Sequence, residues 1–567
     1  MINLRYFKSI VPASAVVLVM AGLSSCTGDL DVTPIDPGTE MNVSEVGLYT
    51  KCYANMALAG NTGADGDCDI DGLDGGTTGF VRQLWNANEL TTDEGICAWG
   101  DPGIDQFNYN TWDASHPMLQ GFYYRLYAGI NYCNHYLEAC AGIDATREAE
   151  VRFLRALYYY HLMDCYGNVP FATALSTESP QRIERAELFK WIESELNACI
   201  GNMQAPVART SKDLGYGRAD QDAANLLLAR MYLNAEVYTG QARWKDAKNY
   251  AEKVITGPHK LWKNGKNNWT AYQMLFMGDN GESGASVEAI LPLLQDGITT
   301  TSWGTTLFLM ASTWKSDMDQ SLYRVNGVDM WLTTGKYGSD TVEVRNCAYG
   351  TDQFWAGNRA RSQFIAKFFP TLKVDEIPHL NIEETAKAAG DDRALFFGID
   401  RETVVSKPTD YTSGFAVGKF RNTYSTGAQP HNGKFVDTDY FLMRSAEAYL
   451  IAAEADARLN SGVTTDTGAG YINELHERAH YSVKLSQYTL DQILDERARE
   501  LYHEGFRRTD LIRYGYFGGD NSGKYLWEWK GGAQNGAAMP AYRNLFAIPS
   551  EDLNANPNLK GFQNPGY

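Results

Sequence analysis

Glu150–Tyr160 reads EVRFLRALYYY, and the same run ends at Tyr166–Pro170, YGNVP. Between Ala149 and Gly167 the apolar residues recur every three or four positions, which is the spacing of one face of an α-helix. Gly167 and Pro170 then interrupt the helical pattern. The residues on this face are Val151, Leu154, Tyr158, Leu162 and Cys165. This stretch therefore predicts an amphipathic helix with a sharp end.

Similar patterns on both sides of this stretch predict further helices. Residues 118–141 predict an antiparallel partner for it. Ala223–Gly240 and Trp244–Gly257 predict a second pair, whose small and aromatic positions resemble a tetratricopeptide repeat with a lengthened turn. Tyr440–Asn460 and Thr489–Tyr514 predict two more long helices. We therefore expect a mainly α fold built on a tetratricopeptide-like scaffold of helical pairs, at about residues 39–60, 118–257 and 436–514.

Two regions between these helices are rich in Gly, Thr, Asn and Trp and lack helical spacing. They cover residues 61–117 and 258–435, and the second forms an irregular insertion with short β-like runs such as Glu288–Leu294 and Phe415–Arg421. Binding groups concentrate in loops that a rigid scaffold carries. The two loop-rich regions are therefore the predicted ligand-binding surface, and residues 515–567 form a C-terminal segment.

The first residues have the pattern of a bacterial lipoprotein signal. Arg5 and Lys8 precede the apolar run Ile10–Leu23, and small residues then lead into Cys26. We expect residues 1–25 to be a lipoprotein signal peptide, Cys26 to be acylated, and residues 26–38 to be an acidic tether before a domain that covers 39–567. An ordinary secretory signal with an incidental cysteine is the alternative.

The charge of the chain excludes one class of function. Its 567 residues hold 50 Lys+Arg and 69 Asp+Glu, a formal net charge of -19. Because an acidic surface repels phosphate backbones, we do not expect this protein to bind nucleic acid. Aromatic residues make up 12% of the chain beside 53 glycines, so rings are available for binding as well as for the core.

Five blocks along the chain resemble, in order, the signature of the SusD/RagB family of Bacteroidetes outer-membrane lipoproteins. They extend from the first helix discussed above to the last residue, and they follow the acylation site. The blocks are Glu150–Tyr160 with Tyr166–Pro170, Ala224–Asn234, Met443–Leu450 with Ala453–Ala455, Glu496–Arg513, and Ile548–Pro549 with Gln563–Tyr567.

The resemblance implies a SusD-like helical scaffold, a lipid anchor in the cell outer membrane through Cys26, and a SusC-like TonB-dependent transporter as partner. In that family the protein captures an oligosaccharide, or in some members a peptide, and delivers it to the transporter without chemistry. We therefore expect a surface-exposed glycan-binding lipoprotein that is not an enzyme and requires no cofactor. The alternative is the same architecture binding a peptide or another non-saccharide nutrient.

Loop aromatics beside polar residues are the candidate ligand-binding groups. Sugar rings present C–H faces, which stack on flat aromatic rings, and a rim of hydroxyls, which needs donors and acceptors. Core burial is the competing interpretation for each ring. The candidates are Trp99, Asp101, Trp303, Trp314 and Tyr323.

His476–His480 reads HERAH and satisfies the HExxH pattern of zinc peptidases, with Glu496 and Glu500 available on the next predicted helix. The segment resembles a family segment that usually has Arg at 476 and Gly at 480. If the helix ends at the same place, His480 lies beyond it and the two imidazoles do not share a face. Zinc proteolysis is therefore the third hypothesis.

Two carboxylates on one predicted helix, Glu447 and Glu454, raise the hypothesis of a glycosidase pair. Seven residues separate their backbones by about 10.5 Å, beyond the usual carboxylate spacing. Because arginines lie three and four residues away, structural ion pairing is the preferred interpretation.

A dense acidic turn resembles the first half of an EF-hand loop but lacks its closing acidic residue, because position twelve is Thr78. We expect a structural calcium ion that uses some of its carboxylates, and simple solvation of a polar turn is the alternative. The carboxylates are Asp67, Asp69, Asp71 and Asp74.

Overall fold

The computed structural model describes residues 44–64, 68–315 and 349–567, together with four short strands between the last two ranges. The helices that form the scaffold are α1 (Glu45–Ala54), α4 (Pro117–Ala139), α5 (Ala145–Tyr166), α6 (Arg185–Cys199), α7 (Gln221–Leu233), α9 (Trp244–Thr256), α14 (Ser445–Leu459), α15 (Asp466–Arg478), α16 (Leu490–Leu501) and α17 (Arg507–Arg513).

Shorter helices and turns connect them. The short α-helices are α2 (Phe80–Trp85), α3 (Ile104–Tyr109), α8 (Ala235–Thr239), α10 (Ala271–Met274), α11 (Thr306–Ala311), α12 (Ser362–Ile365), α13 (Ile382–Ala389) and α18 (Ser550–Ala555). The π- and 3₁₀-helical turns are η2 (Asn86–Leu90), η3 (Ile200–Asn202), η4 (Ala285–Glu288), η6 (Ala366–Phe368), η7 (Val374–Glu376), η8 (Ser522–Lys524), η9 (Lys530–Gly532), η10 (Ala541–Asn544) and η11 (Pro557–Leu559).

The described strands form antiparallel two-stranded pairs and no larger sheet. The pairs are β1 (Ile96–Cys97) with β9 (Asn358–Arg359), β2 (Val169–Phe171) with β3 (Gln181–Ile183), β4 (Ala289–Leu293) with β12 (Tyr440–Arg444), β5 (Arg324–Val325) with β6 (Val328–Asp329), β7 (Thr334–Tyr337) with β8 (Asp340–Glu343), and β10 (Phe396–Phe397) with β11 (Ala416–Val417). The fold is thus mainly α, as predicted.

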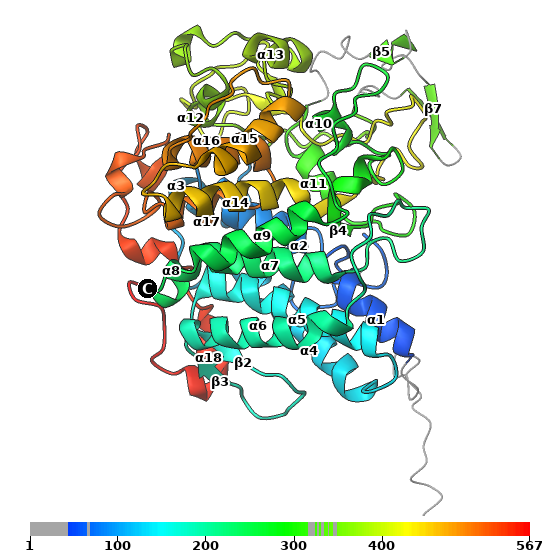
Figure 1. Ribbon diagram of the computed structural model, residues 1–567, viewed down its shortest axis with the longest axis vertical. Coiled ribbons are helices and arrows are strands. Elements are labelled where there is room, and N and C mark those ends of the chain that lie inside the picture. Colours follow the sequence, from blue (N-terminus) through cyan, green and yellow to red (C-terminus); the bar gives the residue numbers. More distant parts are fainter. Residues whose placement is uncertain are drawn as a thin grey trace, which may run out of the picture. The chain divides into compact units, whose positions relative to one another are not determined.

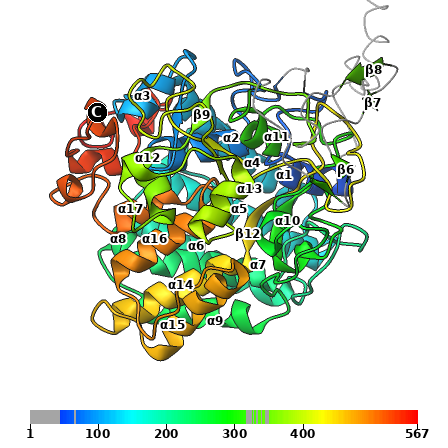
Figure 2. The same cartoon turned by 90° about the horizontal axis from the view of Figure 1, so that it is seen from above.

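The long helices pack as neighbouring rods. α4 packs against α5, α5 against α6, and α9 against both α7 and α14, so segments about 200 residues apart in sequence share one scaffold. In Figure 1, α6, α7, α9 and α14 cross the view one above another in near-parallel rows. Seen from above in Figure 2, α14, α15 and α9 lie together, and β9, α2 and α11 lie away from them, beside α1 and α4. The loop-rich regions thus pack against one side of the scaffold, where α2 contacts α4.

The helix quoted first is fixed at both ends by local signals. Asp144 accepts hydrogen bonds from the backbone N–H groups of Thr146 and Arg147 at 2.9 and 3.0 Å. Gly167 ends the helix with a φ of 76°. Against α4, the Tyr158 ring lies so close to Gly129 that a Cβ there would be 2.4 Å from the ring. The predicted helix and its sharp end are confirmed.

Two predicted long helices are interrupted. Tyr440–Arg444 is the strand β12, because its backbone pairs with β4, and α14 begins only at Ser445. The second helix is broken between α16 and α17, where His503 and Gly505 have φ values of 61° and 85°. Both predictions were wrong at these boundaries, because helical spacing in the sequence does not reveal pairing with a distant strand.

Buried ion pairs join the helices of the second half. Arg444 contacts Glu288 at 2.8 Å and both Glu500 and Glu504 at 2.7 Å, and all four side chains are at most 2% exposed. Arg478 bridges Glu288 and Glu500 in the same cluster. Since an unpaired buried charge is costly, these residues hold α15, α16 and β12 in one arrangement. The charges of this cluster are therefore structural.

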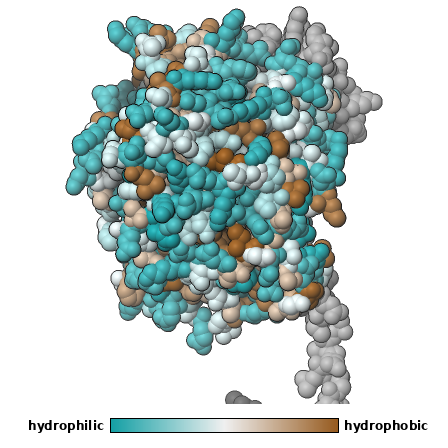
Figure 3. Space-filling view, in the orientation of Figure 1, coloured by the Kyte–Doolittle hydropathy of each residue, from teal (hydrophilic) through white to brown (hydrophobic). Residues whose placement is uncertain are grey.

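One face of the described surface is mainly hydrophilic. Figure 3 shows mainly hydrophilic side chains on the face seen in Figure 1, with apolar residues in small separate patches. Among the described residues, no helix combines the length and apolar character that crossing a lipid bilayer requires. The predicted signal peptide, the predicted acylation site Cys26 and the predicted tether lie outside the described residues.

Candidate functional site

Segments far apart in the sequence enclose an open cavity of about 640 Å³. The cavity is bounded by the loop before α2, by α2 itself, by the loop after β1, and by the segments before α11 and β9. The residues that line it are Ala64, Asp74, Gly75, Gly76, Thr77, Arg82, Trp99, Asp101, Trp303, Gln353 and Trp355. Both predicted loop-rich regions therefore contribute to one site.

Three indole rings form a row along this cavity, with Trp355 in the middle. Its ring centroid lies 6.3 Å from that of Trp99 and 6.0 Å from that of Trp303. The planes are inclined by 54° and 56°, so neighbouring rings are not coplanar. Trp303 also contacts the Phe435 ring, at a centroid distance of 5.0 Å.

The orientation of Trp99 is set by contacts on several sides. Its indole N–H donates to the Trp355 carbonyl oxygen at 2.8 Å. The Arg82 guanidinium lies over the ring at 5.4 Å, and Phe308 meets it edge-on at 6.2 Å. A ring that is held by a hydrogen bond and by packing loses little conformational entropy when a ligand stacks on it.

Arg82 places a buried cation in this aromatic surface. It is 7% exposed, its Nη1 donates to the Gly76 carbonyl oxygen at 3.1 Å, and its guanidinium also lies 5.1 Å from the Phe308 ring. Its buried Nε–H has no hydrogen-bond partner among the described residues. Burial lowers the pKa of Arg82, and the nearby Asp101 and Asp74 carboxylates act in the opposite direction.

The arrangement suits a ligand built of units that each have an apolar face and a polar rim. Indole faces accept C–H surfaces, and the charged and amide groups between them provide donors and acceptors.

The structure brings together three of the five predicted ligand-binding residues. Trp99, Asp101 and Trp303 line the cavity. Trp314 does not: it is 1% exposed, and its ring stacks on Tyr349 at 3.6 Å. The structure thus places Trp314 in the core, because aromatic neighbours cover it. Tyr323 lies outside the described residues.

Three residues that line the cavity were not predicted from the sequence: Trp355, Arg82 and Gln353. Trp355 occurs in a glycine-containing loop, the same signal that identified Trp99 and Trp303. Arg82 lies within the helix FVRQLW, where nothing local distinguishes it from a structural arginine.

The carboxylates assigned to calcium do not converge. Asp69 contacts Arg125 at 2.7 Å and Lys51 at 2.9 Å, and although burial acts to raise its pKa, Arg125 lowers it. Asp74 accepts from the Thr77 backbone N–H at 2.8 Å, Asp71 is exposed, and Asp67 lies outside the described residues. In the part of the chain that the structure describes, no group of three or more His, Cys, Asp or Glu could hold a metal ion. The calcium site stays a prediction.

The two histidines of the HExxH motif are separated by the end of α15. His476 is buried, and its Nε2 lies 2.9 Å from Glu496. His480 follows the helix with a φ of 51°, and its side chain is 75% exposed. This agrees with the expectation that a glycine-type position follows the helix. The imidazoles therefore do not form a pair of ligands on one face.

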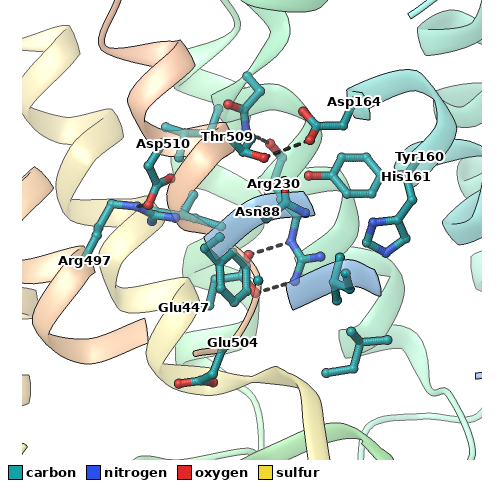
Figure 4. Close-up of a pocket in the computed structure, with 17 residues that line it drawn as sticks. Asn88, Tyr160, His161, Asp164, Arg230, Glu447, Arg497, Glu504, Thr509 and Asp510 are labelled. Atoms are coloured by element: carbon teal, nitrogen blue, oxygen red, sulfur yellow. Dashed lines mark hydrogen bonds and ion pairs between the residues drawn. The ribbon is translucent and has the colours of Figure 1, made fainter. Parts of the chain in front are cut away.

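A second, enclosed cavity is bounded by buried ion pairs (Figure 4). Its volume is about 20 Å³, room for about one water molecule. Arg230 makes two hydrogen bonds of 2.7 Å to Glu447 across it. Glu454 instead pairs with Arg513 and Arg458; burial acts to raise its pKa, but the two arginines lower it to about 2. Both carboxylates are structural, as the sequence indicated, although Arg230 was not the expected partner.

Comparison with known proteins places this chain in a family. Residues 357–567 match the profile described as the SusD family, and residues 82–233 match one described as starch-binding associating with outer membrane. The chain is 36% identical to the starch-binding protein SusD of Bacteroides thetaiotaomicron over 99% of each chain. It is 24% identical to SusD-like protein P25 of Formosa agariphila over 76% of each.

Solved structures show the same fold. A SusD superfamily protein from Parabacteroides distasonis aligns with a TM-score of 0.62 and 19% identity, over 93% of this chain and 100% of that one. Surface glycan-binding protein A from Bacteroides thetaiotaomicron, in complex with laminarihexaose, aligns with a TM-score of 0.60 and 18% identity, over 92% and 98%. With near-complete coverage of a relative at 36% identity, the chain belongs to the SusD family.

Proposed function

We propose that this protein is a cell-surface glycan-binding lipoprotein that captures oligosaccharides and delivers them to a SusC-like TonB-dependent transporter. The observation that carries the proposal is the row of three indoles along an open cavity that Arg82 and two carboxylates also line. The relative at 36% identity is named a starch-binding protein, which supports a glucan as the ligand.

The tilt between the rings favours a glycan that turns along its length. A flat, extended chain presents parallel sugar faces, and it cannot stack on neighbouring rings inclined by 54° and 56°. A helical α-glucan changes the direction of its sugar faces from residue to residue. We therefore propose α-1,4-linked glucose oligomers as the first ligand class to test.

Binding is proposed to proceed without cleavage. Among the described residues, the carboxylates considered for catalysis, Glu447, Glu454, Glu496 and Glu500, are each engaged by buried arginines or by His476. A carboxylate that a buried arginine neutralises is a poor general acid, because the ion pair stabilises its charged form.

The proposed location at the outer membrane is supported by the family and by the N-terminal sequence. The matching profile describes proteins that associate with the outer membrane, and Cys26 provides the proposed acylation site. Since a neutral glycan has no charge to meet the acidic protein, we expect binding to change little with salt.

Binding to polysaccharides and peptides tests the proposal. Mature protein is run in affinity gels that contain amylopectin, laminarin or a soluble cellulose derivative, and a mixed peptide pool is tested by calorimetry. Retardation by amylopectin is expected, weakened about fivefold to tenfold in Trp99→Ala and Trp303→Ala. Phe562→Ala is the control, because this ring is 48% exposed and does not line the cavity. Peptide binding without glycan binding would favour the non-saccharide alternative.

A further inference from the structure

We propose that Gly357 is the positioning residue for Trp99: the absence of a side chain at 357 allows the indole to take its place in the binding row. The inference rests on the proposed glycan-binding function, because it concerns the same cavity. Gly357 does not itself line the cavity and acts only through Trp99.

The contact between the two residues leaves no room for a methyl group. A Cβ built on Gly357 would lie 2.2 Å from Cε2, 2.4 Å from Nε1 and 2.6 Å from Cζ2 of Trp99. These distances are far below the van der Waals contact of about 3.5 Å between carbon atoms. Either the indole or the backbone of Gly357 has to move when any side chain is present.

The backbone at Gly357 is held on both sides, so the ring is the part that yields. The Gly357 N–H donates to the Ser312 carbonyl oxygen at 2.7 Å, and its own carbonyl accepts from the Ala98 N–H at 3.0 Å. The next residue, Asn358, pairs with Cys97 in the β1–β9 ladder. A shift of this backbone would break several hydrogen bonds, each of which stabilises by about 1 kcal/mol.

Movement of the indole, in contrast, removes Trp99 from its place in the row. Its N–H would leave the Trp355 carbonyl, and its ring would leave the Arg82 guanidinium. The ring cannot give way without changing the surface that a sugar would meet. Gly357 therefore influences binding without touching the ligand.

Gly100 provides a matched control beside the same tryptophan. Apart from its chain neighbours Trp99 and Asp101, a Cβ on Gly100 would have no heavy atom within 4 Å. Neither Gly100 nor Gly357 has a φ in the left-handed region, so alanine is compatible with the backbone at both positions. The new methyl group overlaps the Trp99 indole at position 357, whereas at position 100 it overlaps no residue beyond its chain neighbours.

The test uses Gly357→Ala, Gly100→Ala, Trp99→Ala and the double variant of 357 and 99 in the mature chain. Binding of maltoheptaose is measured by calorimetry, and retardation is measured in amylopectin gels. Gly357→Ala should weaken binding about tenfold, like loss of one stacked ring, and Gly100→Ala should not. The double variant should bind no more weakly than Trp99→Ala alone, because no indole is left to displace.

A second measurement needs no ligand. With 5-fluorotryptophan incorporated, the ¹⁹F resonance of Trp99 is identified by its loss in Trp99→Ala. We expect this resonance to shift in Gly357→Ala and to stay in place in Gly100→Ala. An unmoved resonance would overturn the inference, as would a loss of affinity from Gly357→Ala that is equal with and without Trp99.

The two proposals fail in different ways. If the Trp99 resonance shifts in Gly357→Ala but neither this variant nor Trp99→Ala binds more weakly than wild type, the cavity is not the glycan site and the role of Gly357 in binding is overturned with it. If Trp99→Ala weakens binding and Gly357→Ala does not, the site stands and the positioning role alone is rejected.

Discussion

Replacing Trp355 by alanine should weaken glycan binding without unfolding the protein. Its ring lies between the other two indoles, at 6.3 and 6.0 Å, so its loss interrupts the row in the middle. The bond that holds Trp99 uses the main-chain oxygen of residue 355, which alanine retains. The expected loss is that of one stacked ring, about 1 to 2 kcal/mol, or about 5- to 30-fold in Kd.

Trp314→Ala is the contrasting substitution. This ring is 1% exposed and packs between Tyr349 and Phe397, so its removal leaves a cavity in the core. We expect about 3 to 5 kcal/mol of lost stability and an unchanged Kd for the protein that remains folded.

Calorimetry with maltoheptaose and thermal unfolding of both variants distinguish the two roles. The expected pattern is a weaker Kd with an unchanged melting temperature for Trp355→Ala, and the reverse for Trp314→Ala. Wild-type affinity in Trp355→Ala would refute the three-ring site. Weak binding by a fully stable Trp314→Ala would show that the core assignment of that ring is wrong.

Three further predictions concern buried charges. Glu447→Gln should lower the free energy of unfolding by about 3 to 5 kcal/mol, since it leaves Arg230 buried without its carboxylate. Replacing Glu447 by Leu and Arg230 by Met in one variant should recover most of this loss, as measured by chemical denaturation. Burial raises the pKa of Glu89 from its ordinary 4.5 to about 7, so its stabilising contribution is complete below pH 4.5 and is lost as the pH rises through 7. Glu89→Gln should therefore reduce the fall in melting temperature between pH 5 and pH 8; an identical fall would contradict this assignment. His476→Ala should lower the melting temperature, because it removes a buried partner of a carboxylate, whereas His480→Ala should not, and purified wild-type protein should contain no stoichiometric zinc by metal analysis.

The sequence predicted the helices well where local signals decide them. The spacing in Glu150–Tyr160, the Asp144 cap and Gly167 act within a few residues of one another, so they can be read along the chain. Tyr440–Arg444 has helix-compatible spacing but becomes a strand, because β4, about 150 residues earlier, provides its hydrogen-bond partners. Such pairing is invisible in a local pattern.

For the candidate site, too, some residues could be predicted from the sequence and others could not. The sequence alone determined the family signature, the helical scaffold, and the choice of loop tryptophans beside glycine and aspartate, which identified Trp99 and Trp303. Only the tertiary structure decided that Trp355 joins them while Trp314 is buried, because exposure depends on which distant side chains pack against a ring. The same holds for Arg82, whose place in the site depends on contacts with residues up to about 230 positions away. A binding surface assembled from separate loops is a property of packing, and packing joins residues that the sequence keeps apart.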